Sequence, residues 1–124
     1  MIGYRIVEIK NNKILSLFHG TNKSREIKLD KWNKSNIKLV QDGSGDKNKY
    51  LSGWHFLKNE KDCNNFFNKM FKNKENRFVI KCEVRGNIRP KFSNKNGKAC
   101  FLANQIKINY NDVKKYFLVE NNNS

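Results

Sequence analysis

The side chains best suited to chemistry in this sequence are its two histidines, His19 and His55. Imidazole exchanges protons near neutral pH, so a pair of histidines facing one phosphate would serve as base and acid in phosphodiester cleavage. His19-Gly20-Thr21 has the His-x-Thr form of two-histidine phosphoesterases, whereas His55-Phe56-Leu57 lacks the second hydroxyl. The alternative, that both histidines are half-buried and hydrogen-bonded for structural reasons, stays open.

The same tripeptide, His19-Gly20-Thr21, resembles the start of the nicotinamide-nucleotide-binding motif of ADP-ribosyltransferases. In that interpretation Tyr50 would stand for the later tyrosine of the motif. No glutamate motif follows, and 124 residues is short for that fold. We therefore rank an ADP-ribosyltransferase below a protein that binds or cleaves a phosphorylated ligand.

Basic side chains give the chain a formal net charge of +15 and a pI near 9.9, which favours anionic partners such as nucleotides or nucleic acid. Arg85 and Arg89 lie four residues apart and Lys91 follows, and the guanidinium fork binds phosphate with two parallel hydrogen bonds. We expect Tyr50 or Trp54 to stack a base. The full set of predicted ligand-binding residues is His19, Thr21, Ser24, Arg25, Tyr50, Trp54, His55, Arg85, Arg89 and Lys91.

Three cysteines, Cys63, Cys82 and Cys100, form an odd set whose spacing matches no zinc or redox motif. They are typical of small buried apolar side chains in a reduced, cytoplasmic protein. We expect no metal and no cofactor. No apolar run approaches the roughly 20 residues that span a bilayer, so we expect no membrane partner.

One strong helix and several short strands must position these side chains. Apolar residues at helical spacing from Cys63 to Phe71 predict an amphipathic helix that Asn59 can cap. Apolar residues predict strands at 2–9, 13–18 and 50–57, and alternation predicts the strongest strand at 77–85. Shorter strands are expected at 26–29, 99–102, 105–108 and 116–120, with an extended stretch at 88–91, a short helix after Asp30 and one helical turn at 112–115.

This order predicts an α+β fold: a single domain over 1–120, with a curved, largely antiparallel sheet and one main amphipathic helix packed on it. Residues 121–124 are expected to be a frayed tail. The chain length fits one domain and the apolar fraction of 37% is enough for a core.

Several segments resemble a small, uncharacterised family of phage and prophage proteins. The resemblance runs over roughly 14–108. It rests on Leu17-Phe18-His19-Gly20-Thr21, Ser24-Arg25-Glu26-Ile27, Asp42-Gly43-Ser44, Tyr50-Leu51-Ser52-Gly53-Trp54-His55, Val84-Arg85-Gly86-Asn87-Ile88-Arg89-Pro90-Lys91 and Leu102-Ala103-Asn104-Gln105-Ile106. It departs from the family at Asn104, where an aspartate is usual. The resemblance implies a counter-defence protein of the bacterial cytosol that holds or cleaves a nucleotide immune signal.

Our leading hypothesis is therefore capture of a small phosphorylated nucleotide, such as a cyclic dinucleotide or a cyclic ADP-ribose-type signal, in a cationic pocket. The alternatives are a phosphodiesterase using His19 and His55, and a nonspecific nucleic-acid binder that uses diffuse lysine charge. The sequence leaves homo-oligomerisation open.

Overall fold

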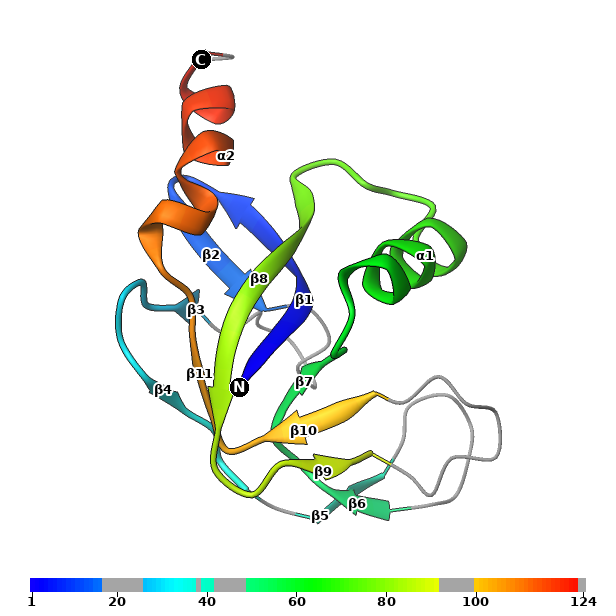
Figure 1. Ribbon diagram of the computed structural model, residues 1–124. Coiled ribbons are helices and arrows are strands. Elements are labelled where there is room, and N and C mark those ends of the chain that lie inside the picture. Colours follow the sequence, from blue (N-terminus) through cyan, green and yellow to red (C-terminus); the bar gives the residue numbers. More distant parts are fainter. Residues whose placement is uncertain (17–25, 38, 42–48, 92–99, 123–124) are drawn as a thin grey trace.

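The computed structural model describes residues 1–16, 26–37, 39–41, 49–91 and 100–122. Figure 1 shows one α+β domain in which a strongly curved sheet carries two helices and two smaller sheets. The elements are β1 (Ile2–Lys10), β2 (Lys13–Ser16), β3 (Glu26–Ile27), β4 (Asn33–Lys34), β5 (Leu39–Gln41), β6 (Lys49–Leu51), β7 (Trp54–Phe56), α1 (Glu60–Met70), β8 (Arg77–Arg85), β9 (Arg89–Pro90), β10 (Phe101–Ala103), β11 (Gln105–Lys107) and α2 (Tyr110–Asn122). The predicted fold class is confirmed.

The main sheet has the strand order β3-β2-β1-β8-β11-β4 with antiparallel pairing throughout, and it curls into a nearly closed, barrel-like shape. Two smaller sheets, β7-β10-β9 and β5-β6, lie at the end of the barrel opposite α2 (Figure 1). The long strands β1 and β8 form the centre of this sheet, and every second residue is buried from Gly3 to Ile9 in β1 and from Ile80 to Val84 in β8.

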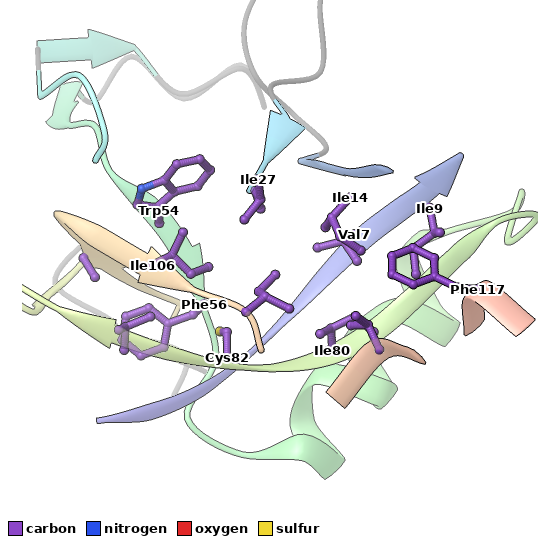
Figure 2. Close-up of a cluster of buried hydrophobic side chains, with 14 residues drawn as sticks. Val7, Ile9, Ile14, Ile27, Trp54, Phe56, Ile80, Cys82, Ile106 and Phe117 are labelled. Carbon is purple, nitrogen blue, oxygen red and sulfur yellow. The ribbon is translucent and has the colours of Figure 1, made fainter. Parts of the chain in front are cut away.

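The inner face of the barrel holds the main core (Figure 2). Val7, Ile9 and Ile80 point inward from β1 and β8, and each is no more than 1% exposed. Trp54 and Phe56 enter the same core from β7. One apolar cluster therefore joins the barrel to the small three-stranded sheet, and this places β7 firmly against the barrel.

Helix α1 covers part of the outer face of β1 and β8. Asn59 caps it as predicted, since its Oδ1 accepts hydrogen bonds from the backbone nitrogens of Lys61 (2.8 Å) and Asp62 (3.3 Å). Cys63 is fully buried against the sheet, whereas Phe66 and Met70 are 41% and 61% exposed. The predicted apolar stripe is therefore wider than the sheet surface it covers.

Two predicted elements are wrong. No helix follows Asp30; that residue turns with a φ of 59° and leads to β4. Its carboxylate instead accepts a hydrogen bond from the backbone nitrogen of Tyr110 (3.0 Å), at the start of α2. The expected helical turn and final strand are one helix, α2, because Val113 and Phe117 at i and i+4 both enter the core.

The predicted strand 50–57 is divided in two at Ser52-Gly53, and its halves, β6 and β7, belong to different sheets. A Cβ at Gly53 would lie 2.9 Å from the carbonyl oxygen of Ala103 and 3.1 Å from Nη2 of Arg89. Glycine has no Cβ, and this allows the close approach of neighbouring backbone at this position. Of the predicted strand 13–18, β2 accounts for 13–16, and 17–18 lie outside the described residues.

Candidate anion-binding surfaces

His55 and Arg89 lie on the same face of the small three-stranded sheet. Leu102 of β10 pairs with His55 of β7 on one side and with Arg89 of β9 on the other. Directly paired residues of antiparallel strands project to the same face, and two strand separations amount to about 10 Å. The structure therefore brings together two of the predicted ligand-binding residues, separated by a buried leucine.

The guanidinium of Arg89 connects four backbone or side-chain oxygens. Nη1 donates to the carbonyl of Asn87 (2.8 Å) and to Oδ1 of Asn104 (3.0 Å). Nη2 donates to the carbonyls of Leu51 (3.4 Å) and Ser52. Arg89 therefore ties the β8–β9 and β10–β11 junctions to the segment between β6 and β7, and these contacts use the fork that a phosphate would need.

Trp54 is a core side chain, 1% exposed, and its Nε1 donates to the carbonyl of Asn33 (2.9 Å). The Arg5 guanidinium lies 5.4 Å from the Trp54 ring centroid and donates to the carbonyl of His55 (2.8 Å). Burial lowers the pKa of Arg5. A ring enclosed in this way is closed to a ligand, so the structure favours the core interpretation of Trp54 over base stacking.

The cysteines lie close to this interior. Burial raises the pKa of Cys63 and of Cys82 to about 12, and it also raises the pKa of Cys100. All three are free thiols. Thiols with such pKa values are neutral and weakly nucleophilic at physiological pH, as expected for apolar packing residues.

The remaining members of the predicted pocket are not brought together by the described residues. His19, Thr21, Ser24 and Arg25 lie outside the described part of the chain. Tyr50 pairs through its backbone with Val40 in the β5–β6 ribbon, and the half-buried Lys91 donates its backbone N–H to Cys100 (2.9 Å). The pairing of the two histidines therefore stays a prediction.

Arg85 lies elsewhere, on the outer face of the barrel. Its Cζ is 3.9 Å from the ring centroid of Trp32, and its Nε donates to Oε1 of Gln105 (2.7 Å). Nζ of Lys107 lies 5.4 Å from the same ring. Arg85 is exposed and Trp32 half-buried, so a cation and an aromatic ring are held together at the surface.

The strand register extends this arrangement into a basic face. Gln105 pairs with Arg85 of β8 and with Lys34 of β4, while Lys107 pairs with Glu83. Their neighbours Val84, Ile106 and Asn33 point inward. We call the outward set the outer basic face; among the described residues it comprises Trp32, Lys34, Lys81, Glu83, Arg85, Gln105 and Lys107.

Glu83 is the acidic side chain of this face. Its carboxylate accepts a hydrogen bond from Nδ2 of Asn109 (2.9 Å) and lies 3.6 Å from Nζ of Lys107. The Asn109 hydrogen bond, with help from Lys107, lowers the pKa of Glu83. Among the described residues, the outer basic face therefore carries four cations and one carboxylate, which leaves an excess of positive charge.

Sequence reasoning overlooked most of this face. It selected Arg85 but placed it in a pocket with Arg89, and it used Trp54 rather than Trp32 as the stacking ring. A signal was present: outward positions 81, 83 and 85 of one strand and 105 and 107 of another are all polar. Only their register across β8, β11 and β4 shows that they share a face.

The chain matches no family model, no curated protein and no solved structure. Neither helix in the described part of the chain is long and apolar enough to cross a membrane. A metal site is also absent there, since no group of three His, Cys, Asp or Glu side chains among the described residues could hold an ion. The phage resemblance stays a hypothesis.

Proposed function

We propose that the protein binds a phosphorylated nucleotide on the outer basic face. The observation that carries this proposal is the exposed Arg85 guanidinium 3.9 Å from the Trp32 ring, with Lys107 beside them. Arginine planes and indole rings both stack on nucleobases, and guanidinium and ammonium groups pair with phosphate. One side-chain cluster thus offers a partner to each part of a nucleotide.

This site differs from the pocket expected from the sequence. Arg89 is engaged by four oxygens of its own chain and Trp54 is enclosed, whereas Arg85 and Trp32 reach the surface. The resemblance to phage proteins extends the proposal to a biological role, which is sequestration of a nucleotide immune signal, with a cyclic nucleotide as one form of it. Capture is the part of the leading hypothesis that the outer basic face supports, because its cations and its aromatic ring offer binding contacts to a nucleotide.

Tryptophan fluorescence with excitation at 295 nm tests the proposal, with ATP as the probe. We expect saturable quenching, because a base stacked at Trp32 quenches one of the two tryptophans. Arg85→Gln should weaken binding by about tenfold or more, the effect of losing a hydrogen bond to a charged group. Lys13→Gln is the control: Lys13 lies in β2 beside Lys10, at the end of β1 away from the outer basic face, so this variant should bind ATP like the wild type.

A thermal-shift series with the same probe gives an independent result, since a ligand that binds only the folded state raises Tm. Trp32→Phe should bind more weakly in this assay, which does not need the indole as reporter. Mass spectrometry of the recovered ATP then separates capture from turnover. The absence of both quenching and a Tm rise would refute nucleotide binding, and a hydrolysed product would refute simple capture.

A further inference from the structure

The cations of the outer basic face are spread along the strands. Lys81 and Arg85 are four residues apart on β8, which is about 13 Å at the usual rise of a strand. Lys107 stands opposite Glu83, between them, on the neighbouring strand β11. The backbone positions of these residues therefore advance by about two residues, roughly 6.7 Å, along the strands, and the charged groups of Lys107 and Arg85 meet at the Trp32 ring.

The Arg85 guanidinium is directed away from Lys81. Nε of Arg85 donates a hydrogen bond to Oε1 of Gln105 in β11, and the guanidinium lies over the ring of Trp32, which precedes β4. The group is thus directed across the sheet, away from the β8 axis. With Arg85 directed toward Trp32, Lys81 lies apart from the aromatic and guanidinium pair, so one mononucleotide stacked at Trp32 leaves part of this face unused.

The face is also open. Helix α1 packs on the part of the outer surface formed by Ile6 and Val79, and α2 contributes Val113 and Phe117 to the inner core. Lys34, Lys81 and Arg85 remain exposed. An open row of cations with an aromatic and guanidinium pair at one end is typical of surfaces that bind unpaired strands, where the backbone follows the charge and bases stack on flat side chains.

We propose that the outer basic face binds a linear single strand of nucleic acid. Successive phosphates would contact Lys81, Lys107 and Arg85, and an unpaired base would stack at Trp32 and Arg85. This inference rests on the proposed function and deepens it by naming the class of ligand. It favours an extended strand over a closed cyclic nucleotide because Lys81 lies farther along β8 than Arg85 and Lys107, whose charged groups meet at Trp32.

Fluorescence anisotropy with 5′-labelled dT12 and U12 tests the proposal and distinguishes DNA from RNA as the source of the strand. Three phosphate contacts predict that log K falls with log salt concentration with a slope of about −2, from about 0.7 per contact for single strands. Unlabelled dT12, dT2, ATP, cyclic di-AMP and a 12-base-pair duplex serve as competitors. We expect dT12 to compete at least tenfold better than dT2 or ATP.

Variants locate the contacts. Lys81→Gln and Lys107→Gln should each make the salt slope shallower by about 0.7, because each removes one phosphate contact. Lys13→Gln is the matched control for charge, and its slope should equal that of the wild type. Circular dichroism and thermal melting of each variant confirm that the fold is retained, and an unchanged slope in folded Lys81→Gln would overturn the proposed track.

Each competitor has a defined meaning. ATP competing as well as dT12 would overturn the inference while nucleotide binding stands. Cyclic di-AMP competing as well as dT12 would overturn the preference for a linear strand, and a duplex competing better would overturn the stacking of an unpaired base. If neither dT12 nor ATP binds, the inference and the proposed function both fail.

Discussion

Replacing Arg89 should destabilise the protein, because this side chain joins three separate segments. Its guanidinium donates to the carbonyls of Asn87, Leu51 and Ser52 and to Oδ1 of Asn104. The hydrogen bonds to Asn104 and Ser52 are partly buried, while those to Asn87 and Leu51 are exposed. Arg89→Ala removes all four and leaves the partly buried acceptors without their donor.

The magnitude follows from this division. A partly buried hydrogen bond from a charged donor contributes about 1–1.5 kcal/mol, and an exposed one contributes little. We therefore expect Arg89→Ala to lower the free energy of unfolding by about 2–3 kcal/mol. For a domain of this size that corresponds to a fall in Tm of about 10 °C.

Urea denaturation followed by circular dichroism measures this loss. Arg89→Lys keeps the charge but not the planar fork, so it should recover less than half of the lost stability. Lys72→Ala, an exposed lysine after α1, is the control for loss of one positive charge and should leave the stability within about 0.5 kcal/mol of wild type. If Arg89→Lys is as stable as the wild type, charge rather than geometry explains the role of Arg89, and our reasoning about the junction is wrong.

Three further predictions concern the core. Gly3→Ala should cost about 1–3 kcal/mol in urea denaturation, because a Cβ there would lie 2.5 Å from Cδ2 of the buried Phe56; wild-type stability would contradict the packing. Asn33→Ala should lower the free energy of unfolding by about 2–3 kcal/mol, because the buried Asn33 amide forms hydrogen bonds with backbone groups of Lys28, Lys31 and Ile106. A loss below about 1 kcal/mol would show that water replaces the Asn33 amide as hydrogen-bond partner. Burial raises the pKa of the Cys82 thiol from its reference value of 9.0 to about 12 in the folded protein. Above pH 9 the thiol ionises more readily in the unfolded chain, so the free energy of unfolding, which has its full value below pH 9, declines by about 1.4 kcal/mol per pH unit. Cys82→Ala should therefore show a shallower loss of stability than the wild type between pH 9 and 10.5, and parallel curves would refute the raised pKa.

Local pattern was sufficient for the central elements. Apolar residues over 2–9 and alternation over 77–85 identified β1 and β8, and helical spacing with an asparagine cap identified α1. These signals are strong because one face of each element is buried, so every second or every third to fourth residue must be apolar. The close approach at Gly53 was also readable, since a glycine within a strand often marks a neighbouring backbone.

Short elements were less predictable, because their conformation depends on distant partners. Asp30 has the side chain of a helix cap, and it does bond the first turn of a helix, but that helix is α2 rather than one that follows it directly. The apolar residues of α2 resemble a short strand until Val113 is included, and the helix is favourable because Val113 and Phe117 both join the main core.

The sequence by itself determined the α+β class, the central strands, the main helix and a strong preference for anionic partners. The tertiary structure decided how the cations are used. Arg85 and Arg89 are four residues apart, yet the chain turns between them at Gly86. The Arg85 guanidinium therefore reaches the surface beside Trp32, whereas that of Arg89 joins the β10–β11 junction to the segment between β6 and β7. Strand register and the change of sheet set this difference, and neither is a property of residue spacing along the chain.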